Sequence, residues 1–216
     1  MALFYFVRHG VSEWNTENRL CGRSDVSLSD EGRRQATRLA ERLRALPPDA
    51  IYTSPLRRTV ETAEIIAATT GLKPIVDARL VELDYGAWEG MTFAEVMDHD
   101  AGAYRAWDAD PGNVAPRGGE SGVRALERVV PFLDELAVRH SAERDHVVVV
   151  CHKTICRLVV CHVLGLSPSE YRRRLSMDNA ALNIIQPHEQ GWRLILLNDT
   201  SHLAPIHTEA TLNGSF

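Results

Sequence analysis

The sequence predicts an α/β protein, a three-layer α/β/α sandwich around a mostly parallel central sheet. Short apolar runs that indicate buried strands alternate along the chain with longer segments of helical periodicity. Two more strand-like segments follow each other near the end of the chain, where they are expected to pair. Such an order is typical of a sheet that is covered by helices. Because no repeat and no linker divides the sequence, we expect one domain over residues 1–216.

The strands are expected where apolar residues run without interruption. Residues 3–7 end at a charged residue and a glycine, and residues 147–150 are valines in a row, which is typical of a strand buried on both faces. Residues 50–53 predict a further short strand. Residues 179–186 and 192–197 predict two strands that are joined by a turn.

The helices are expected where apolar residues recur every three or four positions. Ser29 is a suitable N-cap for the first long helix, and the prolines after residue 46 stop it. The expected helical segments are residues 29–46, 56–70, 92–99 (a short helix), 120–140 and 154–164. Residues 108–122 are rich in glycine, proline and aspartate and predict a surface loop.

Composition narrows the class of protein and its partners. The 216 residues carry a formal net charge of −5, which argues against nucleic acid or an anionic membrane as the main partner. No apolar run reaches the ~18 residues that a membrane span needs. The four cysteines are too few for a disulfide scaffold, so a cytoplasmic location is expected. Three of them recur every five residues, so they fan around a helix and do not converge on a metal.

Two of the expected strands run directly into a histidine. Arg8, His9 and Gly10 follow the first strand, and His152 follows the run of valines. In open α/β sheets, ligands bind outside the carboxyl ends of the strands, so both histidines are expected to face one pocket. Gly10 is expected to let the backbone approach a ligand closely.

Residues 8–15 read Arg-His-Gly-Val-Ser-Glu-Trp-Asn, and further motifs follow in the segments 22–36, 54–63, 80–90 and 118–121. In this order they resemble the motifs of the histidine phosphatase superfamily, also called the phosphoglycerate-mutase-like family. The resemblance covers roughly residues 3–203. It implies a phosphoglycerate-mutase-like fold and an enzyme that transfers a phosphoryl group through a phosphohistidine, with no metal and no cofactor.

The resemblance also implies a role for each matching residue: nucleophile for His9, phosphate binding for Arg8 and Arg58, contact with the transferring phosphoryl group for His152, and general acid for Glu82. These roles suit the side chains. An arginine offers a planar pair of donors to phosphate oxygens, and a neutral imidazole can attack phosphorus. Nearby arginines disfavour protonation of His9, whose other ring nitrogen should donate to a fixed acceptor. Glu82 needs a raised pKa, from burial or from the phosphate, to donate a proton at neutral pH.

Other residues match the family less closely. Ser12 and Asn15 correspond to polar positions near the phosphate. Lys153 stands where a small residue is common, and its side chain is expected either to contact an anionic substrate group, such as a carboxylate, or to point to solvent, which is the usual place of lysines. Tyr85 stands where metal-independent phosphoserine phosphatases tend to have a histidine. Glu89 and Glu120 are the alternative acids, but both are expected to hold loops or cap a helix.

The leading hypothesis is a phosphomonoesterase that hydrolyses a small phosphorylated metabolite, with phosphoserine as one candidate. The length resembles that of the shorter, phosphatase-type members. A cofactor-dependent phosphoglycerate mutase and an α-ribazole phosphatase are the alternatives within the family. A non-catalytic phosphate-binding protein is the alternative of another class, although the presence of all the key residues argues against it. The substrate and the oligomeric state stay open, with a homodimer as one candidate.

Overall fold

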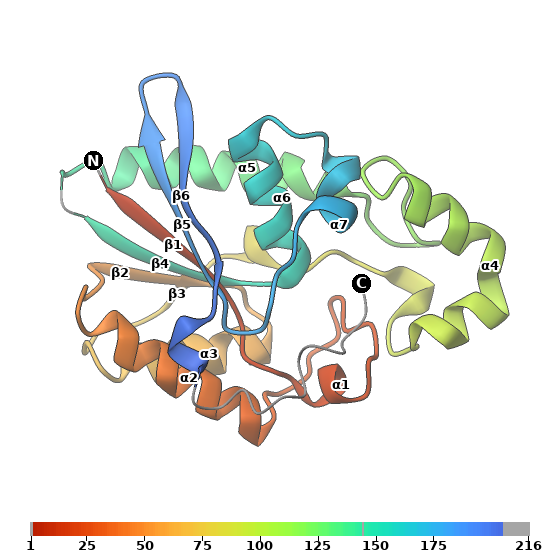
Figure 1. The fold of residues 1–216 in the computed structure, drawn as a ribbon, viewed down its shortest axis with the longest axis horizontal. Coiled ribbons are helices and arrows are strands. Elements are labelled where there is room, and N and C mark those ends of the chain that lie inside the picture. Colours follow the sequence, from red (N-terminus) through yellow and green to blue (C-terminus); the bar gives the residue numbers. More distant parts are fainter. Residues whose placement is uncertain (1, 144, 205–216) are drawn as a thin grey trace.

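A mixed sheet forms the centre of the protein (Figure 1), whose computed structural model describes residues 2–143 and 145–204. In these residues the sheet has the strand order β3-β2-β4-β1-β5-β6, and β5 alone runs against the others. The strands are β1 (Leu3–Arg8), β2 (Ala50–Thr53), β3 (Ile75–Val76), β4 (His146–Cys151), β5 (Leu182–His188) and β6 (Gly191–Asp199). The predicted α/β class with a largely parallel sheet is confirmed.

Helices cover both faces of the sheet (Figure 1). Helices α2 (Asp30–Leu43) and α3 (Arg57–Ala67) pack on one face, and α5 (Gly122–Arg139) and α6 (Lys153–Leu164) pack on the other. Successive strand residues point to opposite faces. In β4, Val147 and Val149 therefore pack in the core under α5 and α6, whereas Val148 and Val150 pack in the core under α2 and α3. The run of valines is buried on both faces, as predicted.

Local signals set the helix ends. The hydroxyl of Ser29 accepts a hydrogen bond from the N–H of Gly32 at 3.1 Å and begins α2. Helix α6 ends at Gly165, whose φ of 65° is the left-handed conformation that a glycine adopts without strain. The short helices α1 (Glu13–Thr16) and α7 (Tyr171–Arg174), like strand β3, were not predicted because their periodic patterns are too short to detect.

Helix α4 (Phe93–Ala109) corrects two expectations, since it runs ten residues beyond position 99 and takes the first residues of the expected loop. The backbone leaves the helical conformation at Asp100, with φ of −145°, and the helix then resumes. Its second half is held by Trp107, which is fully buried and packs edge-on against Trp88 at a ring distance of 5.5 Å. The loop that follows is also less exposed than expected, because Pro111 and Gly112 are buried.

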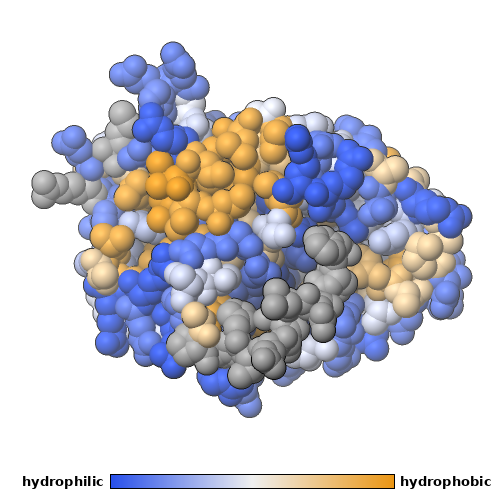
Figure 2. Space-filling view, in the orientation of Figure 1, coloured by the Kyte–Doolittle hydropathy of each residue, from blue (hydrophilic) through white to orange (hydrophobic). Residues whose placement is uncertain are grey.

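Figure 2 shows apolar side chains gathered over β6 and the adjoining α6. Leu164, Ile195 and Leu197 are the exposed large apolar residues of these two elements. None of the helices in the described part of the chain combines the length and the apolar character that crossing a membrane requires.

Candidate active site

The pairing of β1 with β4 places the two histidines next to each other. Arg8 stands opposite Cys151 in the parallel register, so the next residues, His9 and His152, leave the sheet side by side. Their ring centroids are 5.3 Å apart, with an angle of 65° between the planes. Both side chains are buried at the carboxyl ends of their strands, which is where ligands bind in sheets of this kind.

His9 is held in one tautomer. Its Nδ1 lies 2.6 Å from the carbonyl oxygen of Gly10. A carbonyl can only accept, so Nδ1 carries the proton and Nε2 keeps its lone pair. Burial, followed by the positive charges of Arg58 and Arg8, holds the pKa of His9 well below its usual range. The imidazole is therefore neutral at pH 7, as a nucleophile must be.

Gly10 lies against the backbone of α2. A Cβ at this position would lie 2.3 Å from the carbonyl oxygen of Gly32, at the start of α2. This close contact between two backbone segments requires a glycine, and the approach of a ligand stays a prediction. The contact fixes the turn that carries His9 against the first turn of α2.

Arg8 and Arg58 are buried without an acidic partner within the described residues, since no carboxylate lies within 4.0 Å of either guanidinium. Backbone carbonyls hold them instead. Arg58 donates to Ser24 at 2.8 Å and to Gly22 at 2.7 Å, and Arg8 donates to Met177 at 2.6 Å. The Nε–H of each arginine is buried and unpaired. Burial lowers the pKa of Arg8 to about 10, so it stays charged at neutral pH.

His152 has the opposite arrangement from His9. Its Nε2 lies 2.8 Å from the hydroxyl of Ser54, and its Nδ1 is buried without a partner. The Ser54 hydroxyl also accepts from the N–H of Leu56 at 3.4 Å, and its own hydrogen can be donated to Nε2. In that tautomer Nδ1 carries the proton of the ring and is an unpaired donor. Burial and the charge of Arg58 hold the pKa of His152 well below its usual range.

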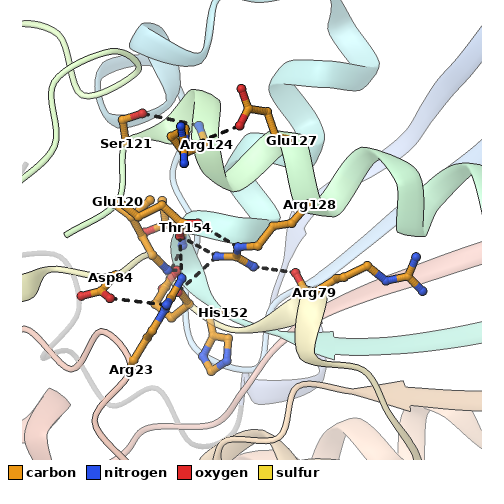
Figure 3. Close-up of polar contacts among 12 residues, drawn as sticks. Arg23, Arg79, Asp84, Glu120, Ser121, Arg124, Glu127, Arg128, His152 and Thr154 are labelled. Atoms are coloured by element: carbon orange, nitrogen blue, oxygen red, sulfur yellow. Dashed lines mark hydrogen bonds and ion pairs between the residues drawn. The ribbon is translucent and has the colours of Figure 1, made fainter.

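Glu82 is buried and tied to the helix that follows His152. Its carboxylate accepts from the backbone N–H of Leu83 at 2.8 Å and from that of Thr154, in the first turn of α6, at 3.1 Å. Arg128 holds the backbone around Glu82. It donates to the carbonyl oxygen of Arg79 at 2.5 Å (Figure 3) and to that of Glu82 at 3.3 Å. The carboxylate is thereby held beside the start of α6.

The two alternative acids hold loops, as expected. Glu89 accepts from the backbone N–H of Arg23 at 2.7 Å and from the hydroxyl of Ser24 at 2.6 Å. The loop 22–24 that it holds supplies the carbonyls that bind Arg58. Glu120 accepts from Arg128 at 2.8 Å and lies 3.4 Å from a guanidinium nitrogen of Arg23 (Figure 3).

Ser12 and Asn15 cap helix α1 by exchanging backbone and side-chain hydrogen bonds of 3.1 and 3.3 Å. Asn15 also reaches the histidine indirectly. The side-chain amide of Asn179 donates to the side-chain oxygen of Asn15 at 3.3 Å and to the backbone carbonyl of His9 at 3.3 Å. A role of Ser12 and Asn15 in phosphate binding stays a prediction. The structure adds Asn179 to the hydrogen-bond network of these two residues.

Lys153 and Tyr85 both lie near the first turn of α6. Lys153 is exposed to solvent, yet burial and the charges of Arg8 and Arg157 lower its pKa to about 7. The Tyr85 hydroxyl is 3.2 Å from that of Thr154, and burial raises its pKa to about 12. Both residues therefore border the segment that contacts Glu82.

Sequence reasoning missed several residues of the site. Ser54 is part of a matching motif, which could have drawn attention to it, whereas Arg128, Met177 and Asn179 act through contacts that no local pattern reveals. Over the described residues, no group of three or more His, Cys, Asp or Glu side chains is arranged to hold a metal ion.

The arrangement is that of a phosphoryl-transfer site: a neutral histidine with a free lone pair beside unpaired donors. The chain belongs to the histidine phosphatase superfamily (branch 1), whose profile matches residues 4–200. Within that family it has the fold of the phosphoglycerate mutase-like phosphatases.

Relatives over nearly the full length are named for related activities. The chain is 38% identical to phosphoserine phosphatase 1 of Hydrogenobacter thermophilus, with 97% of this chain and 98% of that protein covered. It is 34% identical to glucosyl-3-phosphoglycerate phosphatase of Mycolicibacterium vanbaalenii (92% and 95% covered) and 35% identical to a probable phosphoglycerate mutase of Klebsiella pneumoniae (94% and 95% covered).

Solved structures agree with this assignment. YhfR of Bacillus stearothermophilus superposes with a TM-score of 0.87 at 31% identity, covering 94% of this chain and 100% of that one. Mycobacterial glucosyl-3-phosphoglycerate phosphatase in complex with inorganic phosphate superposes with a TM-score of 0.83 at 32% identity, covering 93% and 98%. The chain is thus an enzyme of the phosphatase type, with a mutase as the alternative.

Proposed function

We propose that this enzyme hydrolyses small phosphate monoesters through a phosphohistidine on His9, without a metal or a cofactor. One observation carries the proposal. The neutral His9, with Nε2 free, lies beside the buried Nε–H groups of Arg8 and Arg58, which have no partner, and beside the buried Nδ1 of His152, which has none either. An unpaired buried donor costs about 1–3 kcal/mol. A phosphoryl group offers the acceptors that would satisfy all of them.

In the first step, the lone pair on Nε2 of His9 forms a bond to phosphorus while the ester P–O bond breaks. The protonated carboxyl of Glu82 gives its proton to the leaving oxygen, which departs as an alcohol. Arg8, Arg58 and His152 donate to the phosphoryl oxygens, where charge is spread in the transition state. The carbonyl of Gly10, which accepts from Nδ1, stabilises the positive charge that develops on the ring of His9 as it attacks phosphorus.

In the second step, water attacks phosphorus and displaces His9 from the phosphohistidine. The carboxylate of Glu82 takes a proton from the water, whose oxygen bonds to phosphorus as the P–N bond breaks. Inorganic phosphate leaves, and both His9 and Glu82 return to their starting states. In a mutase, a second hydroxyl would take the place of the water.

The relatives suggest the first substrates to test. The names of the two phosphatases contain phosphoserine and glucosyl-3-phosphoglycerate, and that of the probable mutase contains phosphoglycerate. We add 3-phosphoglycerate to the first two for this reason. We expect release of inorganic phosphate from at least one of them without 2,3-bisphosphoglycerate and in the presence of EDTA. Interconversion of phosphoglycerates that depends on the bisphosphate, with no phosphate release, would instead establish a mutase. Loss of turnover in EDTA would contradict the metal-free scheme.

The expectations of a single domain, a cytoplasmic location and a homodimer also stay proposals. One sheet with a helix layer on each face supports the expectation of a single domain. Light scattering of the purified chain tests the third.

A further inference from the structure

Two cationic side chains on α6 lie beyond the residues that the proposed chemistry uses. Lys153 and Arg157 are four residues apart on this helix and therefore share one face. Thr154, between them, donates its backbone N–H to Glu82. This first turn of α6 thus borders the side of the site where the leaving group must lie, because Glu82 is proposed to protonate its oxygen.

Neither cation has an acidic partner. In the described ranges, no carboxylate lies within 4.0 Å of the side-chain nitrogens of Lys153 or Arg157, and Nε of Arg157 is buried without any partner. The neighbouring Arg172 shows the contrast. It pairs with Asp108 at 2.9 Å, and its guanidinium carbon lies 4.0 Å from the ring centroid of Trp107. The charge of Arg172 is thus paired within the protein, whereas Lys153 and Arg157 have no such acidic partner among the described residues.

Lys153 lies at the start of α6 with its side chain exposed. Desolvation by nearby protein atoms is nevertheless the main cause of its lowered pKa. Arg8 and Arg157 add like charge, and Glu82 is the acidic group that acts on it in the opposite direction. Neighbouring cations repel one another, and an anion that binds among them relieves this repulsion.

We infer that Lys153 and Arg157 form a subsite for a carboxylate on the leaving group, so that the substrates are phosphate esters of small hydroxy acids. In phosphoserine and 3-phosphoglycerate the carboxylate is separated from the ester oxygen by two carbons. It therefore lies on the leaving-group side, toward Glu82 and the first turn of α6. The inference rests on the proposed function and narrows it to a substrate class.

A matched pair of substrates tests the subsite. 3-Phosphoglycerate carries a carboxylate where sn-glycerol 3-phosphate carries a hydroxymethyl group, and kcat/KM is measured for both. We expect the wild-type enzyme to prefer 3-phosphoglycerate by about 10-fold or more, since a hydrogen bond to a charged group contributes about 1.5–3 kcal/mol. Arg157→Met and Lys153→Met should each reduce this ratio by about 10-fold. Arg157→Lys should restore part of it.

The controls separate a binding role from a structural one. Arg124→Met removes an exposed arginine of α5 that pairs with Glu127, and it should leave the ratio unchanged. If Arg157→Met does not fold, judged by circular dichroism, Lys153→Met at its exposed position decides the question. Equal losses on both substrates would overturn the subsite alone. Absence of activity on these substrates and on p-nitrophenyl phosphate would overturn the proposed function and the subsite with it.

Discussion

The hydroxyl of Ser54 and Nε2 of His152 lie 2.8 Å apart, although the two residues are 98 positions apart in the chain. Ser54 follows the end of β2, and His152 follows the end of the neighbouring β4. When the serine donates to Nε2, the proton of the ring is on Nδ1, which is then the nitrogen that can donate to a phosphoryl oxygen. We expect Ser54 to orient His152 in this way.

Ser54→Ala is expected to lower kcat about 10-fold with little change in KM, because the ring of His152 loses its orientation and its tautomer. Ser54→Thr keeps the hydroxyl and should recover most of the rate. Steady-state kinetics on p-nitrophenyl phosphate measures both variants. A normal kcat for the alanine variant would show that His152 needs no help from Ser54.

His9→Ala is expected to reduce kcat by about 1,000-fold or more, since no other described group offers a nucleophile at that place. A wild-type sample quenched during turnover of a radiolabelled substrate should hold acid-labile phosphate, and the variant should hold none. Near-wild-type turnover by the variant would refute the phosphohistidine.

Glu82→Gln removes the proton donor and keeps one amide oxygen, which can accept from either the N–H of Leu83 or that of Thr154, since these bind different carboxylate oxygens. We expect a loss of about 100-fold or more on alkyl phosphates and a smaller loss on p-nitrophenyl phosphate, whose leaving group needs little protonation. The ratio of the two losses is the measurement, and equal losses would count against the acid role.

Glu89→Gln tests how Arg58 is positioned. The carboxylate of Glu89 binds the loop 22–24, and the carbonyls of that loop hold Arg58. A neutral amide can accept only one of the two hydrogen bonds well, so we expect KM to rise and kcat to fall by about 5-fold to 10-fold. Glu64→Gln, near the C-terminal end of α3, is the matched control and should leave both KM and kcat unchanged. Unaltered kinetics in Glu89→Gln would mean that the loop holds its shape without this carboxylate.

The buried histidines make stability depend on pH. The pKa values of His9 and His152 are lowered on folding, so the stability that each contributes is complete above the unfolded value of about 6.5. It is lost as the pH falls below that value, by at most about 1.4 kcal/mol per pH unit for each histidine. Urea unfolding between pH 7 and pH 5 measures this loss. His9→Asn should flatten the dependence, and an identical dependence in both proteins would contradict it.

Local patterns in the sequence were enough for the fold class and for most elements. Apolar runs and helical periodicity report burial directly, which is why β2 and the core of α5 were placed well. Helix α4 was underestimated because its regular pattern ends near Asp100, while its second half is held by Trp107 packing against aromatic residues from another segment. Periodicity cannot reveal such a distant contact.

By itself, the sequence determined the candidates for the chemistry: His9 and His152 at strand ends, the arginines, and Glu82, each recognisable by type and motif. The tertiary structure decided their states and their partners. The register of β1 with β4 places the histidines together, and residues from distant segments, such as Ser54 and Met177, orient them and the arginines. It also showed that α6, which carries Lys153 and Arg157, donates a backbone N–H of its first turn to Glu82. These are contacts between segments far apart in the chain, and they arise only when the sheet and its covering helices are assembled.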